Sequence, residues 1–83
     1  MNSKKADDFR DWLITSRNLR RRSAGDVISR RNKLLSIISD PMMLPIDQVK
    51  AQLEVELVKG AFTRATLSGM VRAEILFRKF ENS

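Results

Sequence analysis

Residues 17–35 have the sequence RNLRRRSAGDVISRRNKLL, which combines strong positive charge with the periodicity of an amphipathic helix. The stretch holds seven of the 16 Lys and Arg residues but only one acid, Asp26. Its apolar residues, continued just beyond its end, recur at the spacing of a single helix face. They are Ala24, Val27, Ile28, Leu34, Leu35 and Ile38. The pattern predicts a helix that turns apolar residues to a core and cations to solvent.

The flanking residues set the expected bounds of this helix. Residues 18–22 are expected to connect it to the preceding helix, and the helix then runs to about Ser39, because the residue before Pro41 avoids the helical backbone region. Ser23 and Asp26 resemble a capping pair, so a start at Ser23 is the alternative. Gly25 lies in the first turns and weakens them by about 1 kcal/mol relative to alanine.

Three further helices are predicted around this one, over residues 6–16, 45–60 and 63–80. Trp12 lies in the apolar stripe of the first of them and is expected to anchor the core, the alternative being a platform on which a base stacks. Gly60 is suited to end the third helix, and Thr63 is suited to cap the fourth. No segment alternates like a strand. The predicted fold is therefore an all-α, four-helix orthogonal bundle made of two helix-turn-helix hairpins.

Length, composition and charge narrow the range of functions. The chain is expected to form one domain over residues 1–83, with residues 1–5 and 81–83 frayed. No apolar run is long enough to span a membrane, which favours a cytoplasmic protein.

Cys, His and Tyr are all absent, so we expect no enzyme, cofactor or metal site. The net charge of +6 favours a polyanionic partner. Duplex DNA is the expected partner, with RNA as the alternative.

The second and fourth helices echo each other at an offset of 43 residues. Ser23 aligns with Thr66 and Leu34 with Phe77, which implies two hairpins of similar design packed together. The same offset aligns Arg31 with Glu74, and each lies near the middle of its helix's apolar stripe. A charge on an apolar face must be paired or must reach water. We therefore predict an Arg31–Glu74 ion pair, the alternative being that each charge reaches solvent separately.

Two longer stretches resemble a known family. They are FRDWLITSRNLRRRSAGDVISRRNKLL at residues 9–35 and IDQVKAQLEVELVKGAFTRATLSGMVRAEILFRKF at residues 46–80. Together they resemble the N-terminal core-binding, or SAM-like, domain of tyrosine recombinases of the phage-integrase class. The positions that match best are Asp47, Gln48, Val49, Leu57, Gly60, Phe62, Thr63 and Thr66.

The resemblance implies a SAM-like fold and a DNA-contacting role for the exposed sides of the second and fourth helices. It does not extend to catalysis, because the family's reaction needs a Tyr nucleophile and a His that this chain lacks. It implies either a stand-alone binding module or a fragment, for example an accessory or regulatory factor of a mobile element or phage. Arg20 stands where the family usually has a capping Ser, which predicts an irregular or shifted helix start.

Exposed cations and hydroxyls on the second and fourth helices are the candidate DNA contacts. Three consecutive arginines, Arg20, Arg21 and Arg22, are placed to bind phosphate at a helix start. Arg30, Lys33 and others lie far enough from the apolar stripe to enter a groove. The complete predicted set is Arg20, Arg21, Arg22, Ser29, Arg30, Lys33, Arg64, Ser68 and Arg72.

A protein-interaction module is the competing prediction. Ala51, Val55 and Val58 lie almost opposite the main apolar stripe of the third helix, and Ile75 lies off the stripe of the fourth. A helix that is apolar on two sides is either sandwiched within the fold or covered by a partner. These four residues could form the interface of a symmetric homodimer or of a larger complex.

Overall fold

The computed structural model describes residues 3–83, which form four α-helices and one short 3-10 helix. In chain order these are α1 (Ser3–Ser16), α2 (Arg21–Ile37), the 3-10 helix η1 (Pro41–Met43), α3 (Ile46–Val58) and α4 (Arg64–Glu81). No strand occurs within residues 3–83, so the predicted all-α, four-helix class is confirmed. None of the described helices is both long and apolar enough to cross a membrane.

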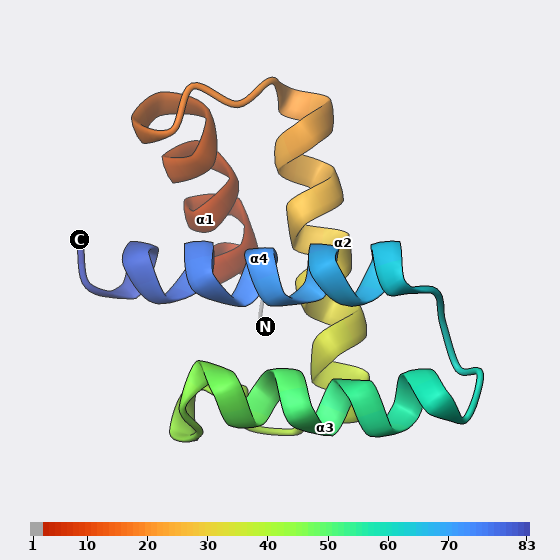
Figure 1. The fold of residues 1–83 in the computed structure, drawn as a ribbon. Coiled ribbons are helices and arrows are strands. Elements are labelled where there is room, and N and C mark those ends of the chain that lie inside the picture. Colours follow the sequence, from red (N-terminus) through yellow and green to blue (C-terminus); the bar gives the residue numbers. More distant parts are fainter. Residues whose placement is uncertain (1–2) are drawn as a thin grey trace.

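The helices form two hairpins, α1–α2 and α3–α4, which cross at a steep angle (Figure 1). α2 packs against both α1 and α4, and α3 packs mainly against α4. The contact between α2 and α4 therefore joins the two hairpins.

The first and last helices extend further towards the ends of the chain than expected. α1 begins at Ser3 rather than near Ala6, and α4 extends to Glu81. Lys5 Nζ lies 2.7 Å from Glu81 Oε1, so an ion pair links the two ends. The part of the fraying prediction that concerns residues 1–2 lies outside the described residues.

The turn between α1 and α2 places Arg20, Arg21 and Arg22 at the start of α2. Asn18 adopts a positive φ of 57°, a conformation that Asn tolerates better than most residues. The Leu19 N–H donates to the Leu13 carbonyl oxygen at 3.1 Å across this turn. α2 then runs from Arg21 to Ile37, so Arg21 and Arg22 belong to the helix and not to the connector, the alternative start at Ser23 is wrong, and the helix ends before Ser39. Arg20 occupies the capping position in an extended conformation, and its side chain makes no capping hydrogen bond.

The turn between α3 and α4 is built by the predicted capping residues. Gly60 has a φ of 83°, and its N–H donates to the Leu57 carbonyl oxygen at 2.9 Å. The Ala61 N–H donates to the Glu56 carbonyl oxygen at 3.1 Å, which completes a Schellman motif. Thr63 Oγ1 accepts from the Thr66 N–H at 3.3 Å and caps α4.

Two apolar clusters make up the core. The first joins α1, the first half of α2 and the second half of α4. It consists of Phe9, Leu13, Ala24, Val27, Ile28, Ala73, Leu76 and Phe77. The second joins the end of α2, α3 and the first half of α4, and consists of Leu34, Ile38, Val49, Leu53, Leu67 and Met70. Trp12 packs against the first cluster, with its ring 6.2 Å from Phe9 and 5.8 Å from Phe80, and is therefore the expected core residue.

The predicted Arg31–Glu74 ion pair is present where α2 crosses α4. Arg31 Nε donates to Glu74 Oε1 at 3.0 Å, and the two residues are only 4% and 0% exposed. The Arg31 guanidinium also lies 3.5 Å from the centre of the Phe77 ring, a cation–π contact. Burial lowers the pKa of Arg31 from its ordinary value, and the charge and hydrogen bond of Glu74 oppose that shift.

Arg78 completes this buried network and was not predicted as part of it. Its Nε donates to Glu74 Oε2 at 2.8 Å. Its Nη2 donates to the carbonyl oxygens of Pro41 and Leu44 at 2.7 and 2.6 Å, which holds η1 against α4. Among the residues the structure describes, no buried side-chain N or O atom lacks a hydrogen-bond partner. In this network, which we call the Arg–Glu–Arg layer, no fully buried polar atom is therefore left without a partner.

Candidate nucleic-acid interface

The basic side chains divide into two groups. Five of the 16 form ion pairs, namely Lys5, Arg10, Arg31, Lys59 and Arg78. The other eleven make no ion pair with an acid in residues 3–83. They are Lys4, Arg17, Arg20, Arg21, Arg22, Arg30, Lys33, Lys50, Arg64, Arg72 and Lys79. The positive charge available to a partner therefore lies mainly on α2, α4 and the turn before α2.

One part of this charge forms what we call the α2 surface. All of its residues are exposed, because the apolar stripe on the opposite side of α2 faces the core. It consists of Arg20, Arg21, Arg22, Ser29, Arg30 and Lys33. Each of these was predicted as a nucleic-acid contact, and the structure places all six on the solvent side of α2 or at its start.

The start of α2 carries charge of the unfavourable sign. A helix N-terminus has a partial positive charge and unsatisfied N–H groups, which acids in the first turn normally offset. α2 has no acid in its first turn, and Arg20, Arg21 and Arg22 stand there instead. Each cation at such a position costs about 0.3–1 kcal/mol of helix stability. The arrangement favours an anion, because three consecutive arginines stand at a helix start whose N–H groups have no side-chain cap.

Arg30 connects the α2 surface to α4. A Cβ atom built on Gly69 would lie 3.1 Å from Arg30 Nε and 3.2 Å from its Cδ, so the side chain crosses α4 where a glycine leaves room. Arg30 and Arg72 both line a pocket of about 190 Å³, together with Ser23 and Asp26. The packing therefore brings together two predicted cations that come from different hairpins.

The two helical glycines provide a test of this contact. Gly25→Ala is expected to raise the free energy of unfolding by about 0.5–1 kcal/mol, because its Cβ would meet no atom within 4 Å. Gly69→Ala is expected to gain less, since the new Cβ must displace Arg30. Urea denaturation of both variants measures the difference. Equal gains would show that Gly69 does not determine where Arg30 lies.

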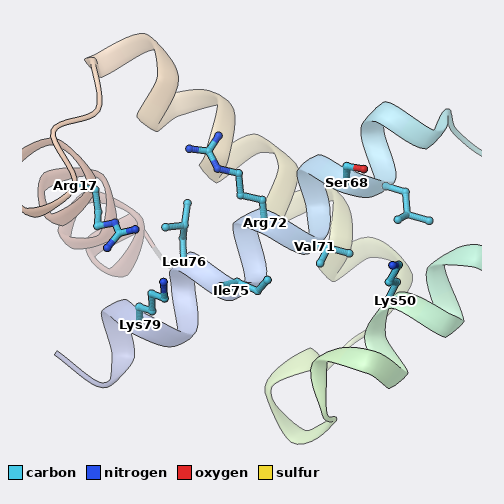
Figure 2. A pocket seen from close by; sticks show the side chains of 9 residues that line it. Arg17, Lys50, Ser68, Val71, Arg72, Ile75, Leu76 and Lys79 are labelled. Carbon is cyan, nitrogen blue, oxygen red and sulfur yellow. The ribbon is translucent and has the colours of Figure 1, made fainter.

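A second basic site, which we call the α4 groove, runs along the outer side of α4 (Figure 2). It has a volume of about 380 Å³. Its cations come from three parts of the chain and are Arg17, Lys50, Arg72 and Lys79. Its apolar lining is Leu67, Val71, Ile75 and Leu76, and Ser68 adds a hydroxyl. No acid lines the groove.

The α4 groove contains some predicted residues and several that were missed. Ser68 and Arg72 were predicted DNA contacts and lie in it, whereas Arg64 is exposed at the start of α4 and lines neither pocket. Arg17, Lys50 and Lys79 were not predicted. Lys79 could have been found, because it lies seven residues beyond Arg72 and so on the same side of α4. Arg17 and Lys50 reach the groove from outside α4, and no sequence signal places them there.

The four residues predicted as an oligomer interface do not form one patch. Ala51, Val55 and Val58 are exposed on the outer side of α3, with Val55 at 55% and Val58 at 87%. Ile75 is 39% exposed but lies in the α4 groove, which none of the other three lines. The four residues therefore lie on two different surfaces of one molecule, and their role as an oligomer interface stays a prediction.

Comparison with known proteins adds no further assignment. Neither a family model, nor a curated protein, nor a solved structure matches this chain. Within residues 3–83, no group of three or more acidic side chains is placed to hold a metal ion. The resemblance to the core-binding domain of tyrosine recombinases stays a prediction.

Proposed function

We propose that this protein is a small, non-catalytic nucleic-acid-binding module that binds duplex DNA through α2 and α4. The α2 surface supplies most of the contacts, and Arg72 and Arg64 extend it onto α4. A role as an accessory or regulatory factor of a mobile element or phage, in the cytoplasm, would accord with the sequence resemblance and is part of this proposal.

The start of α2 is the observation that carries the proposal. Arg20, Arg21 and Arg22 oppose the helix dipole, make no ion pair within residues 3–83 and leave the helix without a side-chain cap. Residues that lower the stability of their own helix are expected where they serve a partner. A phosphate group is a suitable partner, because arginine forks and helix N–H groups both bind it.

The basic residues of α2 and α4 fall into groups according to the part of the DNA that each could contact. Arg20, Arg21 and Arg22 are expected to bind phosphates, which fixes the position of the protein without reading sequence. Arg30 and Lys33 lie further along α2, where side chains can reach base edges in the major groove. Arg72 lies beside Arg30 across the smaller pocket and can add a contact from α4.

Removal of the three arginines tests the proposal. The triple variant Arg20→Ala, Arg21→Ala, Arg22→Ala is expected to lose detectable binding to duplex DNA. It is also expected to be about 1 kcal/mol more stable than the natural chain, because the unfavourable charges at the helix start are gone. Fluorescence anisotropy with duplex DNA, single-stranded DNA and RNA measures the first effect, and urea denaturation measures the second.

A variant with the same loss of charge serves as control. Lys4→Ala, Arg10→Ala, Lys59→Ala removes three cations that lie outside the α2 surface and should retain most of the binding. Equal losses in the two variants would mean that only net charge matters, which contradicts a defined surface. Tighter binding to RNA or to single strands than to duplex DNA would reassign the partner.

A further inference from the structure

The α4 groove has a property that phosphate binding does not explain. Its floor is aliphatic and partly open, with Ile75 39% exposed and Val71 half-buried. Arg72 precedes Ile75 by three residues and Lys79 follows it by four, and Figure 2 shows all three along α4. No aromatic side chain lines the groove for a base to stack on. A partner that covers it should offer both apolar groups and carboxylates.

The outer side of α3 offers this combination on the same molecule. Ala51, Val55 and Val58 form an exposed apolar strip on it. Asp47 and Glu54 lie along one edge of that strip, again seven residues apart. Neither acid forms an ion pair within residues 3–83. We call these five residues the α3 face.

We propose that the α4 groove of one protomer receives the α3 face of a second copy of this chain. Seven residues of helix correspond to about 10 Å along the axis, so the two acids have the spacing of Arg72 and Lys79. The apolar strip of α3 then covers Val71 and Ile75. This is the helix-in-groove mode of recognition, with charge complementarity at both edges.

The positions of the two surfaces allow the contact to be reciprocal. Lys50 lines the groove and lies on α3 four residues before Glu54, hence one helical turn from the α3 face. Groove and face are therefore neighbours on each protomer. A two-fold axis between them would place each face in the opposite groove and yield a closed dimer.

Charge reversal tests the contact in the absence of nucleic acid. The natural chain is expected to form dimers in analytical ultracentrifugation between micromolar and millimolar concentrations. Asp47→Lys, Glu54→Lys and Arg72→Glu, Lys79→Glu should each weaken the dimer at least about tenfold, because like charges then face each other. The combination of all four changes should restore it, whichever way round the two helices lie.

Two further variants keep the result interpretable. Val58→Glu changes a residue that is 87% exposed, so it should give monomers without disturbing the core. Arg22→Glu, Lys33→Glu reverses two charges on the α2 surface and should leave the dimer intact. Circular dichroism confirms the fold of each variant.

Three outcomes would overturn the inference. These are a monomer at every concentration, a dimer that withstands both reversals and Val58→Glu, and a fourfold variant that stays monomeric. The inference does not rest on nucleic-acid binding. A monomeric protein that still binds DNA would refute the dimer alone, and a dimer that binds no nucleic acid would refute only the proposed function.

Discussion

Replacement of Glu74 by alanine is expected to lower the free energy of unfolding by about 3–5 kcal/mol, because it leaves the buried Arg31 guanidinium without its carboxylate. Glu74 is fully buried and receives hydrogen bonds from both Arg31 and Arg78. A domain of this length has a total stability of only about 4–12 kcal/mol. Glu74→Ala should therefore shift urea denaturation, followed by circular dichroism, to much lower denaturant concentration.

A double variant separates the charge effect from the packing effect. Arg31→Met, Glu74→Leu replaces the pair with apolar side chains and is expected to be more stable than either single change to alanine. Arg78 can remain charged in this variant, because its side chain is 25% exposed and still bonds the carbonyl oxygens of Pro41 and Leu44. A loss below about 1 kcal/mol for Glu74→Ala would contradict the buried layer, since it would mean that Arg31 reaches water.

Binding to duplex DNA is expected to weaken steeply with salt. Five or six phosphate contacts correspond to a slope of about −4 to −6 in a plot of log affinity against log salt concentration. Affinity should therefore fall roughly 300- to 4,000-fold between about 50 and 200 mM salt. Anisotropy titrations at several salt concentrations measure this slope.

Single changes on the α2 surface show which residues contribute to that slope. Arg21→Ala should make it shallower by about 1 if Arg21 binds a phosphate, whereas Lys59→Ala should not change it. Arg30→Ala should also lower discrimination between DNA sequences if Arg30 reads a base. A flat salt dependence in the natural chain would contradict electrostatic binding and the proposed function with it.

Features of the fold that depend only on residues close together in the sequence were predictable. The helix periodicities, the break before Pro41, the turn at Gly60 and the cap at Thr63 are local, and each is present. The start of α2 was less certain, because Ser23 competes as a cap. Arg21 begins the helix nonetheless, and the Ala24 N–H donates to the Arg20 carbonyl oxygen at 2.9 Å to close its first turn.

One long-range contact could also be predicted. Arg31 and Glu74 are separated by 43 residues, and their pairing followed from two charges at matching positions of two apolar stripes. Arg78 could not be predicted in the same way, because its partners include the backbone oxygens of Pro41 and Leu44. Every residue has a backbone carbonyl oxygen, so the sequence does not indicate which of them accept a side-chain hydrogen bond.

The residues that one helix exposes could be predicted from the sequence. The residues that come together from different helices could not. The exposed side of α2 follows from its apolar stripe, so the exposure of all six residues of the α2 surface was predictable. The α4 groove depends on how the end of α1 and the side of α3 meet α4, which brings Arg17 and Lys50 to Lys79. The placement of Ile75 in this groove, apart from Val55 and Val58, was unpredictable for the same reason.

The Arg–Glu–Arg layer also bears on which halves of the chain can combine. Arg31 and Glu74 occupy equivalent positions of the two hairpins and face each other at the crossing. Two copies of the first hairpin packed in the same way would oppose two guanidinium groups, and two copies of the second would oppose two carboxylates. Either arrangement would bury like charges without compensation, which costs several kcal/mol. The layer therefore disfavours the pairing of two like hairpins, whereas a first hairpin packed against a second hairpin keeps the buried charges neutralised.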